Sequence, residues 1–502
     1  MTLVIPTDGR RPALLRRCIA GHARQSELDG VTLDLVVCDN SGRADREAAT
    51  REVLREFAVG MSVRFIGTLE RRRYVDALVE QLGPRLRRDA SARDAAVAGA
   101  RAELEYALGP LEFGAGGSLG LSWPRQGSDA PARNALQLAE IGHRYVSVDD
   151  DTTAFFSTVP RLGDDDAMVP RMSADDEPWA DSSDDPTEFW FYPSAQAAFD
   201  DAPRANLRPL YESLFMNALD GQHVLAAMTG LVGDSAMSPS PFLLTRALLT
   251  RAHVQNDYEL ARRARHVRRG VRQPTLTSHP HFMTVCAAFD GRALLPPFLP
   301  LQRNADGLWG SVLRATTGSL IAHVPYCVTH DPGEERPAML SELGAAPTPA
   351  GLVRLVVDVW PRGPVCGNSA ARMRSLATHL LTWAELDAPE FERRLCSLRW
   401  AELERGADRL QAEAELADVL ERNRRPGALR FPPEKWRDDV VEAARAKYLL
   451  VGNPLAIHPP GAGARSYLAA YARLLELWPL VDDAARQLAA RGVRLSVEEP
   501  PF

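Results

Sequence analysis

The sequence RYVSVDDDT at residues 144–152 decides the expected fold, because an aromatic and β-branched run ends there in three carboxylates. Such a run predicts a buried strand. A strand of a parallel sheet delivers the residues after its carboxyl end to the crevice where open α/β sheets bind ligands. Residues i and i+2 of an extended segment share a face, so we expect Asp149 and Asp151 to point the same way and Asp150 elsewhere.

Three neighbouring carboxylates repel one another unless a cation lies between them. Hard oxygen ligands of this kind suit Mg²⁺, Mn²⁺ or Ca²⁺. The stretch therefore predicts one divalent cation held jointly by Asp149 and Asp151.

The sequence on the N-terminal side predicts a parallel sheet. Residues 2–67 alternate between strands at 3–5, 33–38 and 63–66 and helices at 10–23 and 45–57, a pattern typical of α/β folds. Residues 70–108 are helical in pattern, and we interpret residues 70–120 as a helical and glycine-rich insertion packed on the core. A glycine run at 114–120 has neither the P-loop Lys-Ser/Thr nor the G-x-G-x-x-G spacing, and a flexible turn is its interpretation.

Three motifs resemble the nucleotide-sugar half of inverting glycosyltransferases with the GT-A fold, the large family-2-like group. They are LVIPTDGR at 3–10, LDLVVCDNS at 33–41, and ARN at 132–134, which opens a short amphipathic helix before the strand that ends in Asp-x-Asp. The resemblance covers about the first third of the chain well and continues weakly to about residue 335. It implies a GT-A, Rossmann-like mixed sheet with flanking helices.

The resemblance also implies a set of site residues. A nucleotide-diphosphate sugar donor would bind at Pro6, Thr7, Asp8, Arg10, Asp39, Arg133, Asn134, Asp149 and Asp150. A Mn²⁺ or Mg²⁺ ion would be held by Asp149, Asp151 and a late histidine, for which His330 is the first choice and His323 the second. Turn caps are the alternative for Asp8 and Asp39.

The catalytic base is expected at the start of a late helix. Relatives carry an acidic residue before an aromatic there, and Asp306 is the match in LQRNADGLWG at 301–310. The match is partial, because Ala305 stands where paired acids are usual. A helix N-cap is the alternative role for Asp306.

Three further stretches have simpler interpretations. The acidic clusters between 162 and 201 are expected to be solvated loop. The aromatic residues 189–192 are expected to pack in the core, and the arginine-dense residues 242–272 to form a helix.

Composition limits the class of protein. The chain has 502 residues and a formal net charge of −7, which argues against a general nucleic-acid binder. Its six cysteines are far apart without a C-x-x-C pair, so reduced thiols are expected. No apolar run approaches the ~20 residues of a transmembrane helix, and a cytoplasmic protein without a signal peptide is the expectation.

The sequence after about residue 370 is largely helical in pattern, with proline breaks at 425–426, 432–433 and 459–460. We expect a GT-A-like domain at 1–345 and a mainly helical region at 346–502. Acceptor binding, lid formation and homodimerisation are alternatives for the second region.

Together these features predict a metal-dependent inverting glycosyltransferase with Asp306 as general base. Its acceptor is open: a glycan, a lipid-linked sugar, a peptide or a small natural product. One alternative is a nucleotidyltransferase, which the loop PTDGR at 6–10 and the absence of lysine from the first 430 residues oppose. Another is a non-catalytic binding protein on the same core.

Overall fold

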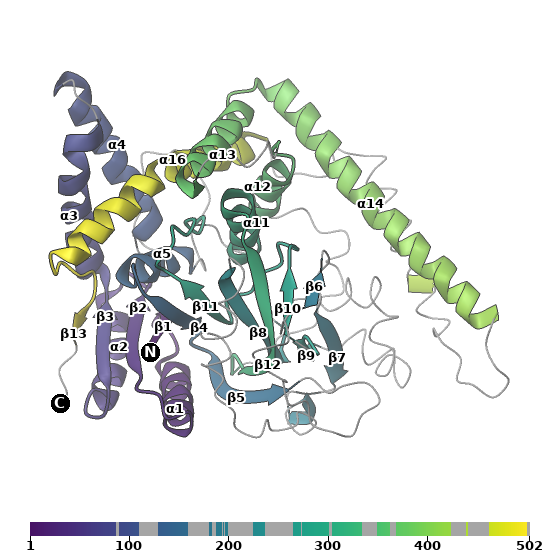
Figure 1. The fold of residues 1–502 in the computed structure, drawn as a ribbon, viewed down its shortest axis with the longest axis horizontal. Coiled ribbons are helices and arrows are strands. Elements are labelled where there is room, and N and C mark those ends of the chain that lie inside the picture. The colour runs from purple at the N-terminus through teal and green to yellow at the C-terminus, as the bar shows by residue number, and fades with distance from the viewer. Residues whose placement is uncertain are drawn as a thin grey trace.

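The computed structural model describes the chain over residues 1–86, 90–109, 129–158, 180–182, 187–192, 194, 196–198, 224–235, 265–272, 274–300, 304–333, 349–361, 368–422, 438–439 and 461–498. Every strand within these residues belongs to one mixed sheet, and helices flank it (Figure 1). The expectation of an α/β fold with a large mixed sheet is confirmed.

The strands are β1 (Thr2–Thr7), β2 (Asp34–Asp39), β3 (Ser62–Ile66), β4 (Arg144–Val148), β5 (Thr152–Thr158), β6 (Ala180–Ser182), β7 (Glu188–Tyr192), β8 (Val224–Asp234), β9 (His266–Gly270), β10 (Thr275–Thr277), β11 (Cys286–Asp290), β12 (Leu320–His330) and β13 (Val497–Glu498). The helices are α1 (Pro12–Leu28), α2 (Ala44–Phe57), α3 (Thr68–Leu86), α4 (Ala90–Leu108), α5 (Ala130–Ala139), α11 (Ala305–Thr317), α12 (Pro349–Asp358), α13 (Ser369–Ala384), α14 (Ala388–Arg422) and α16 (Gly461–Ala490). The predicted alternation of strands and helices over residues 2–67 is confirmed, as is the helical pattern of residues 70–108.

The sheet has a parallel part and a mixed part. Its main path runs β13-β3-β2-β1-β4-β11-β8-β12-β10-β6. The pairs β3/β2, β2/β1 and β1/β4 are parallel, whereas β11 is antiparallel to both β4 and β8. β12 is parallel to β8 and antiparallel to β5.

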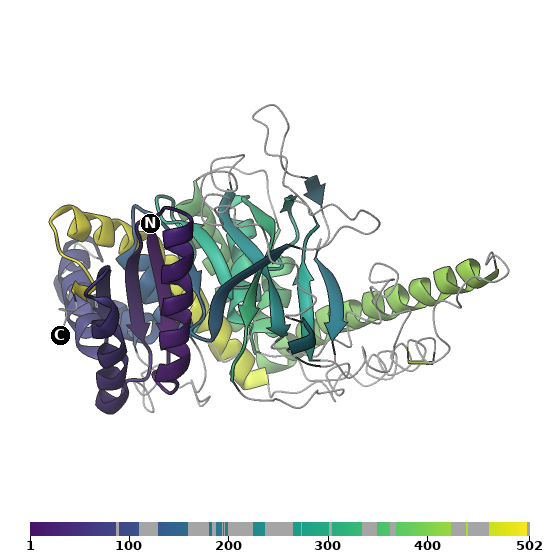
Figure 2. The same ribbon diagram turned by 90° about the horizontal axis from the view of Figure 1, so that it is seen from below.

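Both faces of the parallel part are buried, which explains why its strands are apolar throughout. Leu3 and Ile5 of β1 pack with α1 and α2 on one face, and Val4 packs on the other. Residues from α3, α4, α5, α11, α12, α13 and α16 cover that second face in one hydrophobic cluster. Figure 2 shows α1 lying along the parallel strands, on the face opposite α16.

The C-terminal helices are part of this packing. Tyr471 Oη and Trp478 Nε1 of α16 donate to Pro297 O over 3.0 Å and to Leu295 O over 2.9 Å. β13 pairs with β3 at the edge of the sheet. The division at residues 345 and 346 stays a prediction, but side chains from both sides of it share one core.

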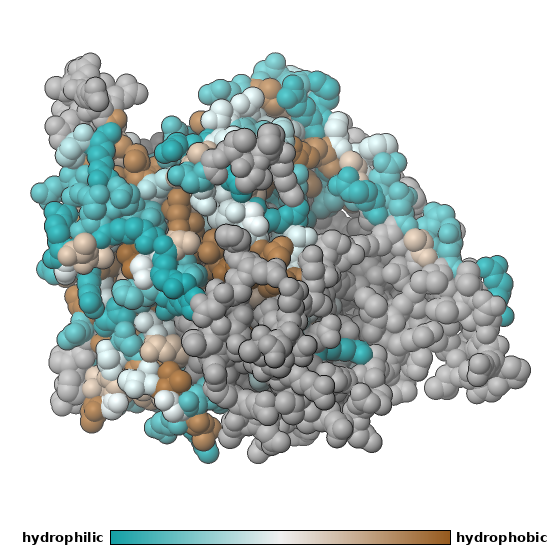
Figure 3. All heavy atoms as spheres, in the orientation of Figure 1, coloured by the Kyte–Doolittle hydropathy of each residue, from teal (hydrophilic) through white to brown (hydrophobic). Residues whose placement is uncertain are grey.

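Helix α14 extends away from the body in both ribbon views. Its sequence is rich in Glu and Arg, and its described residues present mainly hydrophilic side chains in Figure 3. No helix in the described ranges is long and apolar enough to cross a membrane.

One expectation about secondary structure is wrong. The described end of the arginine-dense segment forms strand β9, in which Arg268 and Arg269 are almost fully buried between β7 and β8. The Arg268 guanidinium lies 5.1 Å from the Trp190 ring centroid and 5.8 Å from that of Tyr192, so the aromatic residues of β7 offer Arg268 cation–π contacts that the helical pattern did not indicate. Trp190 and Tyr192 are buried, as expected.

The glycine run at 114–120, most of the acidic segment 162–201 and the three proline breaks lie outside the described residues. The cysteines among the described residues are free.

Candidate active site

The chain changes direction across the sheet between β1 and β4. It moves outward from β1 to β2 and β3, and later returns on the other side of β1 as β4. These neighbours are parallel, so their carboxyl ends meet at one edge. A crevice that binds ligands forms at such a switch point in open α/β sheets.

A cavity of about 180 Å³ opens at this switch point. The loops after β1, β2 and β4 and the end of β12 contribute to its lining, which consists of Pro6, Thr7, Asp8, Arg11, Asn40, Asp129, Asp149, Asp150, Asp151 and His330. Five of these residues are aspartates, so the cavity is strongly acidic. The structure therefore brings together Pro6, Thr7 and Asp8 of the first loop, the aspartate triplet and His330.

The three aspartates form a tight turn and do not continue β4 as an extended segment. Thr152 N donates to Asp149 O over 3.1 Å, and Thr152 Oγ1 donates to the same carbonyl over 2.7 Å. The alternation that would place Asp149 and Asp151 on one face is therefore absent. Asp150 is not turned away, because it lines the cavity together with Asp149 and Asp151, and the joint hold of Asp149 and Asp151 on one cation stays a prediction.

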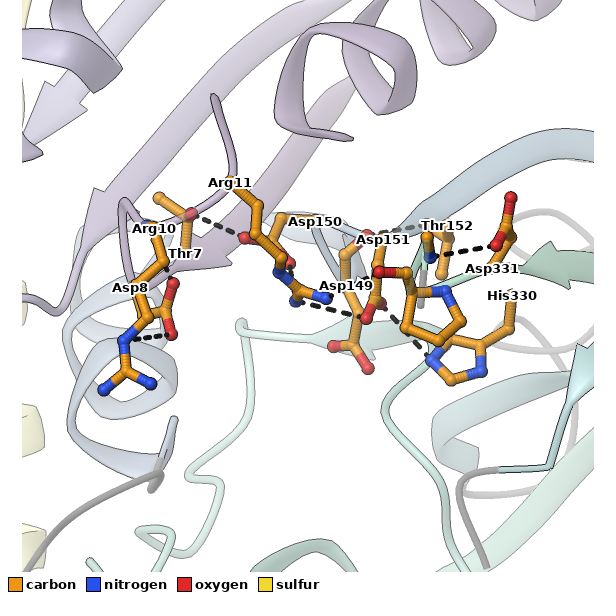
Figure 4. Close-up of polar contacts among 12 residues, drawn as sticks. Thr7, Asp8, Arg10, Arg11, Asp149, Asp150, Asp151, Thr152, His330 and Asp331 are labelled. Carbon is orange, nitrogen blue, oxygen red and sulfur yellow. Dashed lines mark hydrogen bonds and ion pairs between the residues drawn. The ribbon is translucent and has the colours of Figure 1, made fainter. Parts of the chain in front are cut away.

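Asp150 and Asp151 instead share a cation supplied by the protein (Figure 4). Arg11 Nη2 lies 3.1 Å from Asp150 Oδ1 and 3.2 Å from Asp151 Oδ2. The second oxygen of each carboxylate has its own partner. Thr7 Oγ1 donates to Asp150 Oδ2 over 2.6 Å, and His330 Nε2 lies 3.3 Å from Asp151 Oδ1.

Asp149 is bound by a different arginine, Arg133 of α5. Arg133 donates from Nη2 to Asp149, from Nε to Asp129 over 2.5 Å and from Nη1 to Ser147 Oγ over 3.2 Å. Only 4% of its side chain is exposed. Arg133 is thus a fixed structural cation beneath the cavity.

His330 ends β12 and is oriented by the neighbouring strand. Its Nδ1 lies 2.5 Å from Asp234 O, and a carbonyl can only accept, so Nδ1 carries a proton and Nε2 faces Asp151. The following loop is attached to α1, because Arg17 donates to Asp331 Oδ2 over 2.8 Å and to Asp331 O over 2.7 Å.

His323 is buried in β12 opposite Thr275. It pairs with Met228 of β8, whereas His330 pairs with Gly233, five residues or roughly 17 Å farther along that strand, and it does not line the cavity.

Burial and neighbouring charges shift the pKa values of Asp150, Asp151 and His330 in different directions. Burial and the charge of Asp151 raise the pKa of Asp150 to about 7. Burial would also raise the pKa of Asp151, but the hydrogen bond and charge of His330, together with Arg11, hold it well below its usual range. Burial opposes protonation of His330, yet Asp151 raises the pKa of His330 to about 9. Asp151 and His330 therefore form an ion pair at neutral pH.

Asp39 fixes the loop geometry and does not line the cavity. It is fully buried, and its oxygens accept from Ser41 N over 2.8 Å and from Thr50 Oγ1 over 2.6 Å. A β-carbon at Gly9, where φ is +65°, would lie 2.8 Å from Asp39 Oδ2, so only glycine lets the first loop approach so closely. The residue of the β2 loop that lines the cavity is Asn40.

Asn134 and Arg10, two other predicted donor-binding residues, also do not line the cavity. Asn134 is fully buried, donates to Ala107 O and Phe298 O and accepts from Phe298 N over 2.7 Å. It therefore joins α5 to two backbone segments. Arg10 is exposed, and its Nε lies 3.3 Å from Asp8 Oδ2. Asp8 lines the cavity and also accepts from Arg10 N over 2.9 Å, as a turn residue does.

Asp306 lies in the first turn of α11 and is not its N-cap. The N-cap is Asn304, with a left-handed φ of 64°, a conformation that asparagine tolerates. Asp306 Oδ1 accepts from Gly307 N over 2.9 Å. Burial and the charge of Asp129 raise the pKa of Asp306, while Gly307 N–H and Arg133 oppose the shift. Asp306 is thus within electrostatic reach of the cluster that holds Asp149.

Sequence reasoning missed Arg11, Asn40 and Asp129. A further missed residue is Arg71 of α3, which is buried and donates to Asn40 Oδ1 over 3.1 Å and to Leu108 O over 3.1 Å. A charged residue in the first turn of the helix after a parallel strand gives little signal by itself. Its position behind Asn40 becomes evident only in the folded chain.

Comparison of the chain with family models, with curated proteins and with solved structures returned no match. The function is therefore inferred from the geometry and chemistry of the cavity.

Proposed function

We propose that this chain is an inverting glycosyltransferase of the GT-A type, which transfers a sugar from a nucleotide-diphosphate donor to an acceptor nucleophile with the help of a divalent cation. The observation that carries the proposal is the acidic cavity at the switch point between β1 and β4. Five aspartates line it, whereas four cations contact them, namely Arg10, Arg11, Arg133 and His330. This imbalance favours a further cation.

The residues at the turn fit Mn²⁺ or Mg²⁺. In the described parts of the chain, no three His, Cys, Asp or Glu side chains are arranged to hold a metal by themselves. Mg²⁺ in nucleotide sites is typically held by one or two carboxylates together with substrate phosphates. Asp150 and Asp151 supply two carboxylates, and His330 adjoins them. Asp149 suits the role less well because Arg133 occupies one of its oxygens.

A divalent cation in this position would supply charge that stabilises the leaving nucleotide diphosphate. The chain itself positions the site. Thr7 and His330 fix the two carboxylates from outside, and Arg133 neutralises Asp149 and Asp129 from below. The carboxylates are therefore held in place before a ligand arrives, which reduces the cost of binding.

Asp306 is our candidate for the general base that deprotonates the acceptor. It belongs to α11, is half-buried, and is influenced by the charges of Asp129 and Arg133. A raised pKa makes a carboxylate a stronger base, and burial together with Asp129 raises the pKa of Asp306. Attack by the acceptor on the sugar, from the side opposite the diphosphate, would invert the configuration at the anomeric carbon.

A thermal-shift screen of nucleotide sugars, each with and without Mn²⁺ or Mg²⁺, tests the proposal. A ligand that binds only the native state stabilises it by RT ln(1 + [L]/Kd), which is about 2.7 kcal/mol at a hundredfold excess over Kd. We expect a metal-dependent stabilisation by at least one nucleotide sugar, with release of the nucleotide on incubation. If no nucleotide or nucleotide sugar stabilises the protein with either metal, the proposal is wrong.

A further inference from the structure

Arg11 occupies the place where the acidic turn would hold a cation. Its Nη2 bridges Asp150 Oδ1 and Asp151 Oδ2 at 3.1 and 3.2 Å. Arg11 is the N-cap of α1 and makes no capping hydrogen bond through its side chain. A third contact, from Nη1 to Pro332 O, is long at 3.3 Å. These two carboxylates are therefore the principal partners of the guanidinium.

The two arginines of the cavity differ in their freedom to move. The Arg11 side chain is 29% exposed, whereas that of Arg133 is 4% exposed. Arg133 is also held on three sides, by Asp129, Ser147 and Asp149. Arg11 extends from the start of a helix into an open cavity, and solvent reaches it. Of these two arginines, Arg11 is therefore the freer to leave its partners, and its departure would open Asp150 and Asp151, now 8% and 10% exposed, to a ligand in the cavity.

The carboxylates keep their positions without Arg11. Thr7 Oγ1 holds Asp150 through Oδ2, and His330 holds Asp151 through Oδ1. The backbone of the turn is fixed by Thr152 and by Asp331 N, which donates to Asp151 O over 3.0 Å. The two oxygens that face Arg11 would therefore remain directed at the same point if the guanidinium withdrew.

We propose that Arg11 is an exchangeable counterion, which a divalent cation displaces from Asp150 and Asp151 and which then binds the phosphates that arrive with that cation. The inference rests on the proposed nucleotide-diphosphate function. A guanidinium and a divalent cation repel each other and cannot both occupy these two oxygens. Arginine donates well to phosphate because its planar fork matches the phosphate oxygens.

The exchange has two consequences for affinity. Without phosphates, Arg11 competes with the metal, so metal binding to the free protein is weakened. With phosphates, the released guanidinium gains new partners, so metal and diphosphate strengthen each other's binding. Arg11 would thus favour capture of the metal–diphosphate complex over capture of the bare ion.

The experiment measures Mn²⁺ binding by electron paramagnetic resonance in the full chain and in Arg11→Gln. We expect Arg11→Gln to bind Mn²⁺ alone roughly tenfold more tightly, because a unit charge adjacent to the ion has been removed. Arg16→Gln is the matched control. It removes the same charge from the same helix, but Arg16 is exposed and paired with Glu56 at a Nε–Oε2 distance of 2.8 Å, so Mn²⁺ affinity should not change.

The second arm adds inorganic pyrophosphate at saturating Mn²⁺ and measures its affinity by calorimetry. Arg11→Gln should bind pyrophosphate roughly ten- to hundredfold more weakly, as expected when charge-assisted hydrogen bonds are lost. Arg11→Lys keeps the charge and is expected to bind bare Mn²⁺ as the unmodified protein does, while binding pyrophosphate more weakly. This variant also serves if Arg11→Gln does not melt cooperatively.

The outcomes separate the two proposals. Equal or weaker Mn²⁺ affinity in Arg11→Gln, with Mn²⁺ binding intact in the unmodified chain, overturns the exchange alone. Unchanged pyrophosphate affinity in the same variant overturns the phosphate-binding role. If neither protein binds Mn²⁺ at millimolar concentration, with or without pyrophosphate, the exchange and the metal assignment of the proposed function both fail.

Discussion

Replacing Arg133 by methionine removes the cation beneath the acidic turn while keeping most of the side-chain volume. Truncating one partner of a buried ion pair costs roughly 3–5 kcal/mol, because the other charge stays buried without compensation. The Asp149 side chain is 26% exposed and that of Asp129 is 50% exposed, so solvent recovers part of the loss. We expect the free energy of unfolding to fall by about 3 kcal/mol, the lower end of that range.

A double-mutant cycle isolates the interaction. Urea unfolding followed by tryptophan fluorescence is measured for Arg133→Met, Asp149→Asn and the double variant. The double variant should be less destabilised than the sum of the single ones, with a coupling of about 2 kcal/mol, since the buried unpaired charge at Asp149 is gone and only the half-exposed charge of Asp129 remains. Arg16→Met with Glu56→Gln, an exposed pair on α1 and α2, should show a coupling below about 1 kcal/mol. If the coupling at Arg133 and Asp149 is as small as at this control pair, the account of Arg133 as a buried structural cation is refuted.

Four other predictions concern single features. Asp150→Asn should weaken Mn²⁺-dependent pyrophosphate binding in calorimetry more than Asp149→Asn does, and the reverse order would restore the pairing expected from the sequence. Asp306→Asn should lower the rate of sugar transfer roughly 10²- to 10⁴-fold. Because Asn304 is the N-cap, the variant should keep nearly the same melting temperature and donor affinity. Retained turnover excludes Asp306 as the base. Burial lowers the pKa of His22 to about 3 from an ordinary value near 6.5. Between these two pH values only the unfolded chain protonates His22, so the free energy of unfolding falls by up to about 1.4 kcal/mol per unit of decreasing pH. His22→Gln should flatten that slope in acid unfolding curves, and an unchanged slope contradicts the lowered pKa of His22. Deleting α16 should abolish cooperative melting, because its tyrosine and tryptophan fill the core, and a truncated chain that still melts cooperatively would show that α16 is dispensable.

The parallel part of the sheet was predictable because its physical causes are local. Strands such as Leu3 to Ile5 are apolar on both faces, and helices of ordinary length separate them. The position of the aspartate triplet after β4 follows from the same pattern. The arginine-dense segment was wrongly predicted to be helical throughout, because arginines are rarely buried in a strand. The aromatic partners that accommodate Arg268 lie on β7, far away in sequence.

The residues of the site were easier to predict than their partners. Asp150, Asp151 and His330 were identified by position, but the pairing of the two aspartates depends on a turn whose hydrogen bonds no residue pattern specified. Arg11 is separated from Asp150 by 139 positions, so its role becomes apparent only once β1 and β4 are neighbours. Asp39 and Asn134 have the residue types expected of ligand contacts, yet their polar atoms are used by nearby backbone and hydroxyl groups.

The packing of α16 has a consequence for how the protein folds during synthesis. The face of the sheet that α16 helps to cover is built from strands and helices that leave the ribosome much earlier. Contacts so distant in sequence form slowly, and until they form, the apolar residues of α3, α4 and the segment around Leu295 are exposed to solvent. We therefore expect the emerging chain to depend on chaperones until residues 461–490 have been translated, and ribosome-bound chains stalled before residue 461 to be far more sensitive to protease than chains stalled well after residue 490.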